Sequence, residues 1–271
     1  MRIQRIICAS LAFAICLLTT SAKSTAQSAE SYQNMTQPQR SDFVAEQARR
    51  LARQMSGRDY EFTANFDAQI QKAVDFYARR IGNNGGDKLG RGEARFIFER
   101  GQTVAPTLSG IFKARGVSPL VGIYIPLVES EYLNLQSPNS VGAIGMFQFL
   151  PQTGAQYGLA SNDLLDVPKS ADAAARYIAA GLHRFRDDPM KEALALLAYN
   201  RGAESVERDL AALVNEQNRA CSICALTEQS DKLDANFRNE SVYYVPRFFA
   251  AAIIGENPRA FGLPTPPLST L

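Results

Sequence analysis

Apolar residues at helical spacing recur along most of this chain, and strand-like alternation is scarce. Residues three and four apart share one face of a helix, so such spacing produces an apolar stripe that must be buried. With 271 residues and 46% apolar content, the chain can fill a substantial core. The sequence therefore predicts a globular, mainly α fold.

Apolar periodicity, polar cap residues and Gly or Pro breaks delimit the expected helices. Gly202 is the expected stop between two of them. The Gly82 to Gly92 segment lacks the Gly-Lys-Ser/Thr ending of a phosphate-binding loop and is predicted to be a turn. The expected helical segments are 41–55, 66–81, 92–100, 104–115, 170–186, 189–200, 203–215 and 240–254, with an apolar run over 120–128.

The first residues are typical of a secretory signal peptide. Arg2 and Arg5 precede an apolar run from Ile6 to Leu18, and small residues lead to an expected cleavage after Ala26. A membrane anchor is the alternative, but the run is shorter than the ~20 residues that span a bilayer. We therefore expect a periplasmic, cell-wall-associated protein with no stable membrane span after cleavage.

The charge balance disfavours nucleic acid as a partner. The chain has 29 Lys and Arg against 27 Asp and Glu, and cleavage would remove Arg2, Arg5 and Lys23, leaving 26 against 27. A nearly neutral protein lacks the positive field that holds a phosphate backbone.

Two cysteines, Cys221 and Cys224, remain after cleavage and form a C-x-x-C pair. Export favours a structural disulfide between them, with a free thiol pair as the alternative. A redox site would be expected at the start of a helix after a strand, and zinc would need two more ligands. The single histidine, His183, lies in a helical run and is predicted to be at the surface or its boundary. No metal site is expected.

The carboxylate most suited to chemistry is Glu129, which directly follows the apolar run from Ile123 to Val128. Burial disfavours the charged form of a carboxylate and raises its pKa. A carboxyl group protonated near neutral pH can donate its proton to a glycosidic oxygen. On spacing alone, however, a surface acid at a helix end is the simpler interpretation.

Three ordered motifs change that interpretation. Residues 129–130 and 142–153 correspond to E-S, G-A-x-G-L-x-Q and P-x-T patterns, residues 198–202 (AYNRG) to A-Y-N-x-G, and residues 240–246 (ESVYYVP) to E-T-x-x-Y-V-P. Together they resemble the soluble lytic transglycosylase family, and the last motif most resembles its membrane-bound transglycosylase D-like branch. Phe147 replaces the usual Trp, Arg201 replaces a small residue, and the loop from Glu129 to Gly142 is one residue longer than the common form.

The resemblance implies a lysozyme-like, goose-type helical domain that cleaves the β-1,4 bond between N-acetylmuramic acid and N-acetylglucosamine in peptidoglycan glycan strands. It also implies no cofactor and one catalytic carboxylate, Glu129, acting as acid and then base to give a 1,6-anhydro product. The substrate's N-acetyl group can assist, so no second carboxylate is required. Glu131 is expected to point elsewhere.

The remaining roles are carried over by position, with a packing role as the alternative for each. Ser130 would hold the turn, the glycines would allow a tight turn or close approach to sugar, and the tyrosines would bond Glu129 or the sugar. Asn200 would brace the cleft, and the insert around Cys221 to Asp234 would cap one end of it. The candidate substrate-binding residues are Ser130, Gly142, Gly145, Gln148, Tyr199, Asn200, Glu240 and Tyr244.

The motifs and the composition predict five segments along the chain. The segments are a signal peptide (1–26), a flexible leader (27–40), an N-terminal helical extension (41–100), the catalytic domain (101–263) and a tail (264–271). A goose-type hydrolase and a non-catalytic peptidoglycan-binding or assembly protein are the alternative functions. The sequence leaves open a role in wall turnover or beside an envelope-spanning secretion or conjugation machine.

Overall fold

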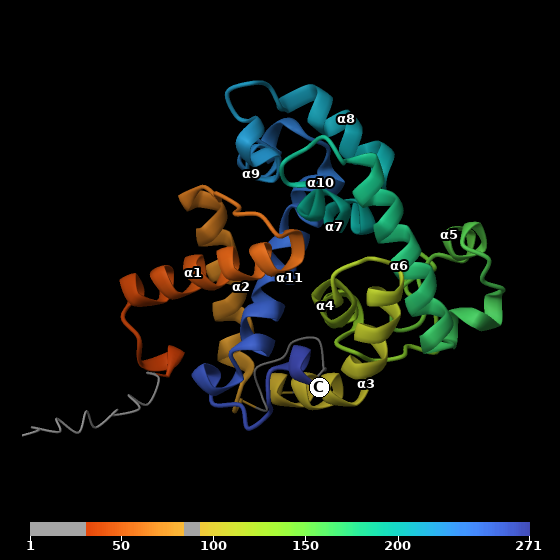
Figure 1. The fold of residues 1–271 in the computed structure, drawn as a ribbon, viewed down its shortest axis with the longest axis horizontal. Helices are drawn as coiled ribbons and strands as arrows, with labels where there is room; N and C mark the ends of the chain where they lie inside the picture. Colours follow the sequence, from red (N-terminus) through yellow and green to blue (C-terminus); the bar gives the residue numbers. More distant parts are fainter. Residues whose placement is uncertain (1–30, 84–92) are drawn as a thin grey trace, which may run out of the picture.

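The structure is a computed structural model that describes residues 31–83 and 93–271 (Figure 1). These residues form helices and no β-strand, with one isolated bridge between Ile144 and Phe149. The predicted mainly α fold is confirmed. The signal peptide expected at 1–26, the start of the leader and most of the Gly82 to Gly92 segment lie outside the described residues. In the described ranges, no helix has the length and apolar character needed to cross a membrane.

The α-helices and 3-10 turns follow one another along the chain, and a long loop over 131–150 separates α4 from α5. The α-helices are α1 (Gln37–Ser56), α2 (Ala64–Arg80), α3 (Ala94–Ala114), α4 (Pro119–Ser130), α5 (Pro151–Gln156), α6 (Val167–Arg184), α7 (Lys191–Arg201), α8 (Ala203–Leu213), α9 (Ser222–Glu228), α10 (Ala235–Asn239) and α11 (Tyr244–Glu256). The 3-10 turns are η1 (Tyr32–Asn34), η2 (Ser161–Leu165), η3 (Arg219–Cys221), η4 (Ser230–Lys232), η5 (Ser241–Tyr243), η6 (Pro258–Phe261) and η7 (Leu268–Thr270).

Helix α11 is the central element of the fold. Nearly every residue in it is buried, and it packs against α1, α2, α4 and α7. In Figure 1 it runs between the α1–α2 pair and the α3–α4 pair. A helix that is apolar on all sides must be enclosed by other elements. Helices from both ends of the chain therefore share one core with the segment that contains Glu129.

The prediction of a flexible leader over 27–40 is wrong for residues 31–40, the part of it that the structure describes. Helix α1 begins at Gln37 because Thr36 caps it, and Thr36 and Gln39 form a reciprocal capping box. Pro38 lies in the first turn, where no backbone N–H is needed. Tyr32 is buried, and its hydroxyl donates to Asp75 at 2.9 Å.

The expected break between 92–100 and 104–115 is also wrong, because both segments belong to the continuous helix α3. The boundary expected between residues 100 and 101 thus falls inside a helix. Gly101 explains the error. A Cβ there would lie 2.9 Å from both Leu268 and Tyr132, so glycine permits close packing at this point and does not end the helix.

The tail expected at 264–271 is folded onto the protein. Leu268 is 1% exposed, and the backbone N–H of Ser269 donates to Glu256 at 3.1 Å. Helix α3 and the turn η7 are in contact. This segment fills the space that Gly101 leaves open.

Leu268→Ala should therefore lower the free energy of unfolding by about 2–4 kcal/mol, because it leaves a cavity against α3. Leu271→Ala is the matched control, since Leu271 is 44% exposed and such surface changes typically cost less than about 0.5 kcal/mol. Urea unfolding of the two variants makes the comparison. Equal costs would contradict the packing of this segment.

Candidate active site

A left-handed turn ends α4 at Glu131, two residues after Glu129. Glu131 and Tyr132 have φ angles of 53° and 61°, which are unfavourable for residues with a side chain. The buried Glu131 carboxylate pairs with Arg80 of α2 at 2.7 Å, and Arg100 of α3 donates to the Glu131 carbonyl at 3.0 Å. These contacts hold the turn and direct the Glu131 side chain away from Glu129.

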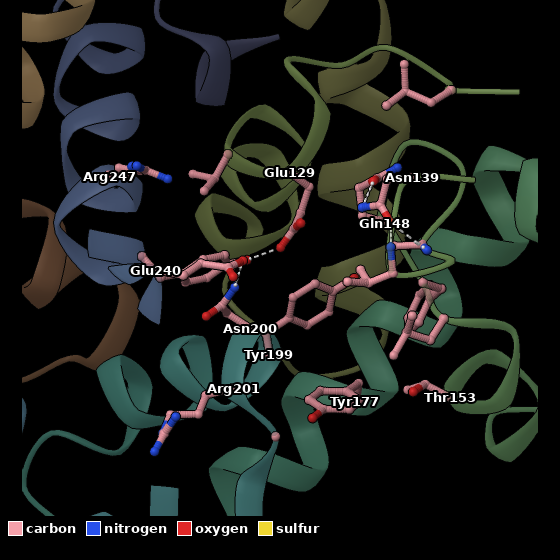
Figure 2. Close-up of a pocket in the computed structure, with 18 residues that line it drawn as sticks. Glu129, Asn139, Gln148, Thr153, Tyr177, Tyr199, Asn200, Arg201, Glu240 and Arg247 are labelled. Atoms are coloured by element: carbon pink, nitrogen blue, oxygen red, sulfur yellow. Dashed lines mark hydrogen bonds between the residues drawn. The ribbon is translucent and has the colours of Figure 1, made fainter. Parts of the chain in front are cut away.

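A cleft of about 620 Å³ lies beside the end of α4 (Figure 2). The lining residues come from α4, from the loop between α4 and α5, from α5, α6 and α7, and from the segment around α11. The structure brings together these candidates from the sequence analysis: Glu129, Gln148, Tyr199, Asn200, Glu240 and Tyr244.

The Glu129 carboxyl group is half-buried and accepts a hydrogen bond of 2.6 Å from the Tyr244 hydroxyl. Burial raises the pKa of Glu129 from 4.5 to about 7. The Tyr244 hydrogen bond lowers this pKa, and the negative charge of Glu240 raises it. Glu129 is therefore suited to hold a proton near neutral pH and to release it into the cleft.

The other tyrosine has a different partner. The Tyr199 hydroxyl donates to the carbonyl of Phe147 at 2.9 Å, and its ring packs edge-on against Phe149 and Tyr177. Phe147, where the family usually has Trp, is buried and stacks on Phe112. Tyr199 thus ties α7 to the loop before α5 and presents its ring to the cleft.

Asn200 and Glu240 form a second polar pair in the cleft. The side-chain amide nitrogen of Asn200 donates to Glu240 at 3.2 Å, and the Ser241 hydroxyl donates to the side-chain amide oxygen of Asn200 at 2.8 Å. The bracing role expected for Asn200 corresponds to these contacts, which join α7 to η5.

Gln148 has a φ of 50°, which is uncommon for a residue with a side chain. Its amide nitrogen donates to the Gly145 carbonyl at 2.7 Å, and its amide oxygen accepts from Asn139 at 3.2 Å. Asn139 also accepts from the backbone N–H groups of Val141 and Ala143. These bonds orient the Gln148 side chain within the cleft wall.

Three candidates do not line the cleft. The buried Ser130 hydroxyl lies 2.8 Å from the Met146 carbonyl and joins α4 to the loop. Gly145 has a φ of 78°, and a Cβ there would lie 2.3 Å from the Leu164 carbonyl. Gly142 has a φ of 90° in a turn closed by Asn139. Local packing and turn geometry account for these residues, in line with the turn-holding role expected for Ser130 and the tight turns expected for the glycines.

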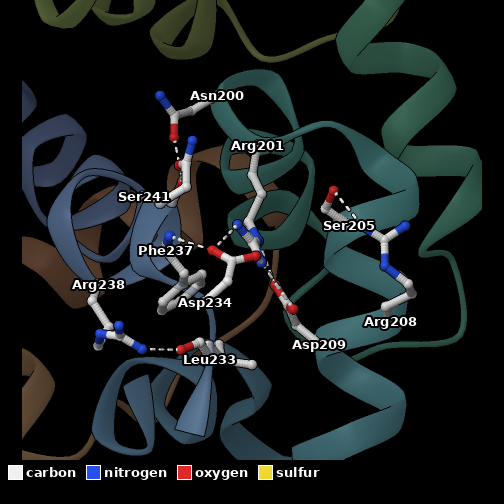
Figure 3. Close-up of polar contacts among 11 residues, drawn as sticks. Asn200, Arg201, Ser205, Arg208, Asp209, Leu233, Asp234, Phe237, Arg238 and Ser241 are labelled. Carbon is white, nitrogen blue, oxygen red and sulfur yellow. Dashed lines mark hydrogen bonds and ion pairs between the residues drawn. The ribbon is translucent and has the colours of Figure 1, made fainter. Parts of the chain in front are cut away.

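Arg201 replaces a small residue of the motif and organises the region behind Asn200 (Figure 3). Its guanidinium binds Asp209 of α8 and donates to Asp234 at 2.8 Å. Asp234 in turn caps α10 by accepting from Phe237 at 2.8 Å. Gly202, with a φ of 81°, separates α7 from α8 as expected. One side chain thus fixes α7, α8 and α10 relative to one another.

Among the described residues, the Cys221 to Asp234 insert contributes none to the cleft lining, and the cap expected of it stays a prediction. Cys221 and Cys224 form a disulfide within it. Cys221 ends η3 and precedes α9, and Cys224 lies in the first turn of α9, so the pair is at the start of a helix that follows a 3-10 turn instead of a strand. Both cysteines are buried. His183 is exposed on α6, and no metal-binding group of three His, Cys, Asp or Glu occurs among the described residues.

Several cleft residues lie outside the sequence motifs. Asn139 follows Pro138 in a loop, which is a turn signal, although nothing linked it to Gln148. Tyr177 and Arg247 lie on helices whose facing sides depend on the fold. Val141 is 72% exposed at the cleft.

The raised pKa of Glu129 predicts that the natural protein and the Glu129→Gln variant differ in stability by an amount that depends on pH. Because its folded pKa of about 7 exceeds the ordinary 4.5, the folded state binds the proton more tightly and loses stability as pH rises through this interval. Glu129→Gln removes the penalty. The variant should be more stable than the natural protein by about 1–3 kcal/mol near pH 8 and nearly equal near pH 4. Urea unfolding across this range tests it, and a difference independent of pH would contradict it.

The family model of the transglycosylase SLT domain matches residues 111–220. The match covers Glu129, Gln148, Tyr199 and Asn200, and it ends before Glu240 and Tyr244, which nevertheless line the same cleft. Among curated proteins, none matches the chain. The helical fold, the cleft and the matching domain model together identify residues 111–220 as a transglycosylase SLT domain with a lysozyme-like helical fold.

Proposed function

We propose that this protein is a peptidoglycan lytic transglycosylase that cleaves the β-1,4 bond between N-acetylmuramic acid and N-acetylglucosamine. The observation that carries the proposal is the Glu129 carboxyl group, half-buried in a cleft, with a pKa of about 7 and a hydroxyl donor on one oxygen. A group with these properties serves as an acid and, after losing its proton, as a base.

In the first step, Glu129 protonates the glycosidic oxygen, and the bond between that oxygen and C1 of the muramic sugar breaks. The leaving N-acetylglucosamine keeps the oxygen and the proton. Positive charge develops at C1, where the substrate's own N-acetyl group can stabilise it. The Tyr244 hydroxyl stabilises the carboxylate that Glu129 becomes, because its hydrogen bond favours the charged form.

In the second step, the Glu129 carboxylate accepts the proton of the muramic 6-hydroxyl as that oxygen bonds to C1. The product is a 1,6-anhydro end, no water is consumed, and Glu129 is again protonated. One carboxyl group thus serves both steps. The Asn200–Glu240 pair and the Gln148 amide offer polar contacts for sugar hydroxyl and acetamido groups, and the Tyr199 ring offers an apolar face.

The proposal includes export to the periplasm, where peptidoglycan is accessible. The basic and apolar pattern of residues 1–26 supports it. The Cys221–Cys224 disulfide also supports it, because disulfides persist in oxidising compartments.

Digestion of purified cell-wall sacculi tests the reaction. The protein should release muropeptides with 1,6-anhydro ends, and Glu129→Gln should reduce the rate by roughly 10²- to 10⁴-fold, as quantified by mass spectrometry. Only reducing ends would assign a goose-type hydrolase instead. Binding to sacculi with no more release than the variant would assign a non-catalytic protein.

Tyr244→Phe should move the alkaline limit of activity upward. The phenol stabilises the charged form of Glu129, so its removal raises the pKa of Glu129 above about 7 and keeps the acid protonated to higher pH. The pH profile of kcat/KM provides the measurement. Tyr199→Phe is the matched control, because that hydroxyl bonds Phe147 and not Glu129. A downward movement for Tyr244→Phe, or an equal movement in both variants, would contradict the assignment.

A further inference from the structure

A second cavity of about 660 Å³ adjoins the cleft. Val128 and Arg247 line both spaces, so the two are neighbours on either side of these residues. The second cavity is built mainly from α2 of the N-terminal region, from α9 to η5, and from the start of α11. We call it the basic cavity. Nothing in the proposed reaction uses it.

The charges in the basic cavity are unbalanced. Glu131 is its one lining carboxylate within the described residues, and it is neutralised by its buried ion pair with Arg80. Lys72, Arg238 and Arg247 also line the cavity, are exposed, and have no carboxylate partner in the described parts of the chain. Three positive charges thus face a space open to solvent, where opposite charge is attracted.

The cavity also presents aromatic rings to solvent. Phe76 on α2 is 47% exposed and Tyr243, the last residue of η5, is 42% exposed, and both are lining residues. The Arg247 guanidinium lies over the Tyr243 ring at 5.7 Å from its centre. Exposed aromatic rings beside unpaired cations are typical of binding sites for ligands that combine apolar and anionic groups.

We propose that the basic cavity binds the carboxylates of the peptide stem on the muramic acid of the strand held in the cleft. This inference rests on the proposed function. The glycan strand is itself uncharged where its lactyl groups are joined to peptide by amide bonds, whereas the stem carries free carboxylates and leaves the strand beside the bond to be cleaved. A side cavity that adjoins the cleft at Val128 and Arg247 matches that branching.

Binding measurements with a turnover-deficient protein test this proposal separately from catalysis. The probes are a disaccharide–tetrapeptide released from sacculi and the same disaccharide after enzymatic removal of its peptide. In the Glu129→Gln background, adding Lys72→Glu should weaken calorimetric binding of the peptide-bearing probe by about three- to tenfold at ~0.15 M salt. Binding of the peptide-free probe should not change. Lys72→Arg should retain the affinity.

Lys113→Glu is the matched control, because Lys113 is an exposed lysine on α3 that lines neither cavity. It should leave both affinities unchanged. Equal losses for both probes with Lys72→Glu would place the contact on the sugar strand and overturn the proposal. The absence of any loss, in Lys72→Glu and in Lys72→Glu combined with Arg238→Glu, would overturn it as well. If instead the proposed function is wrong, the natural protein will release no muropeptides with 1,6-anhydro ends from sacculi, whatever the binding result.

Discussion

The buried Arg80–Glu131 ion pair is the constraint on which the site depends. Two consecutive residues with positive φ follow the helix that carries Glu129, and such a turn persists only where its surroundings hold it. Here α2 supplies the guanidinium and α3 supplies a second arginine to the carbonyl. Breaking a buried pair leaves an uncompensated charge, typically at a cost of about 3–5 kcal/mol. The N-terminal helices are therefore part of the structure that positions Glu129, although they precede the matched domain.

Helix α11 joins the elements of this site. It brings Tyr244 to Glu129 on one side and places Arg247 between the cleft and the basic cavity. Because its residues are buried against both α2 and α4, the two cavities keep a fixed relation to each other. On the opposite wall of the cleft, Arg201 binds Asp209 and Asp234 and so holds α8 and α10 beside Asn200.

The parts of the site that could be predicted from sequence are those carried by short ordered motifs. Glu129, Asn200 and Tyr244 belong to such motifs, and the structure brings them to one cleft. Contacts between residues far apart in the chain could not be predicted from the sequence. Gly101 resembles a helix break in the sequence, and only its position beside Leu268 shows why glycine lies inside a helix. The Thr36–Gln39 capping box begins a helix within a segment whose polar composition indicates a leader. Ser130 and Gly145 belong to a functional motif, yet their contacts are with backbone carbonyls, which a motif does not reveal.

The bond between Tyr244 and Glu129 joins residues 115 positions apart in the chain. Contacts of such sequence separation form after local helices, because the closure of a long loop costs entropy. In the unfolded chain the Glu129 carboxyl group is solvated and has the ordinary acidity of a glutamate. Its raised pKa is thus a property of the folded protein, and the proposed use of Glu129 as an acid near neutral pH depends on the packing of distant segments around it.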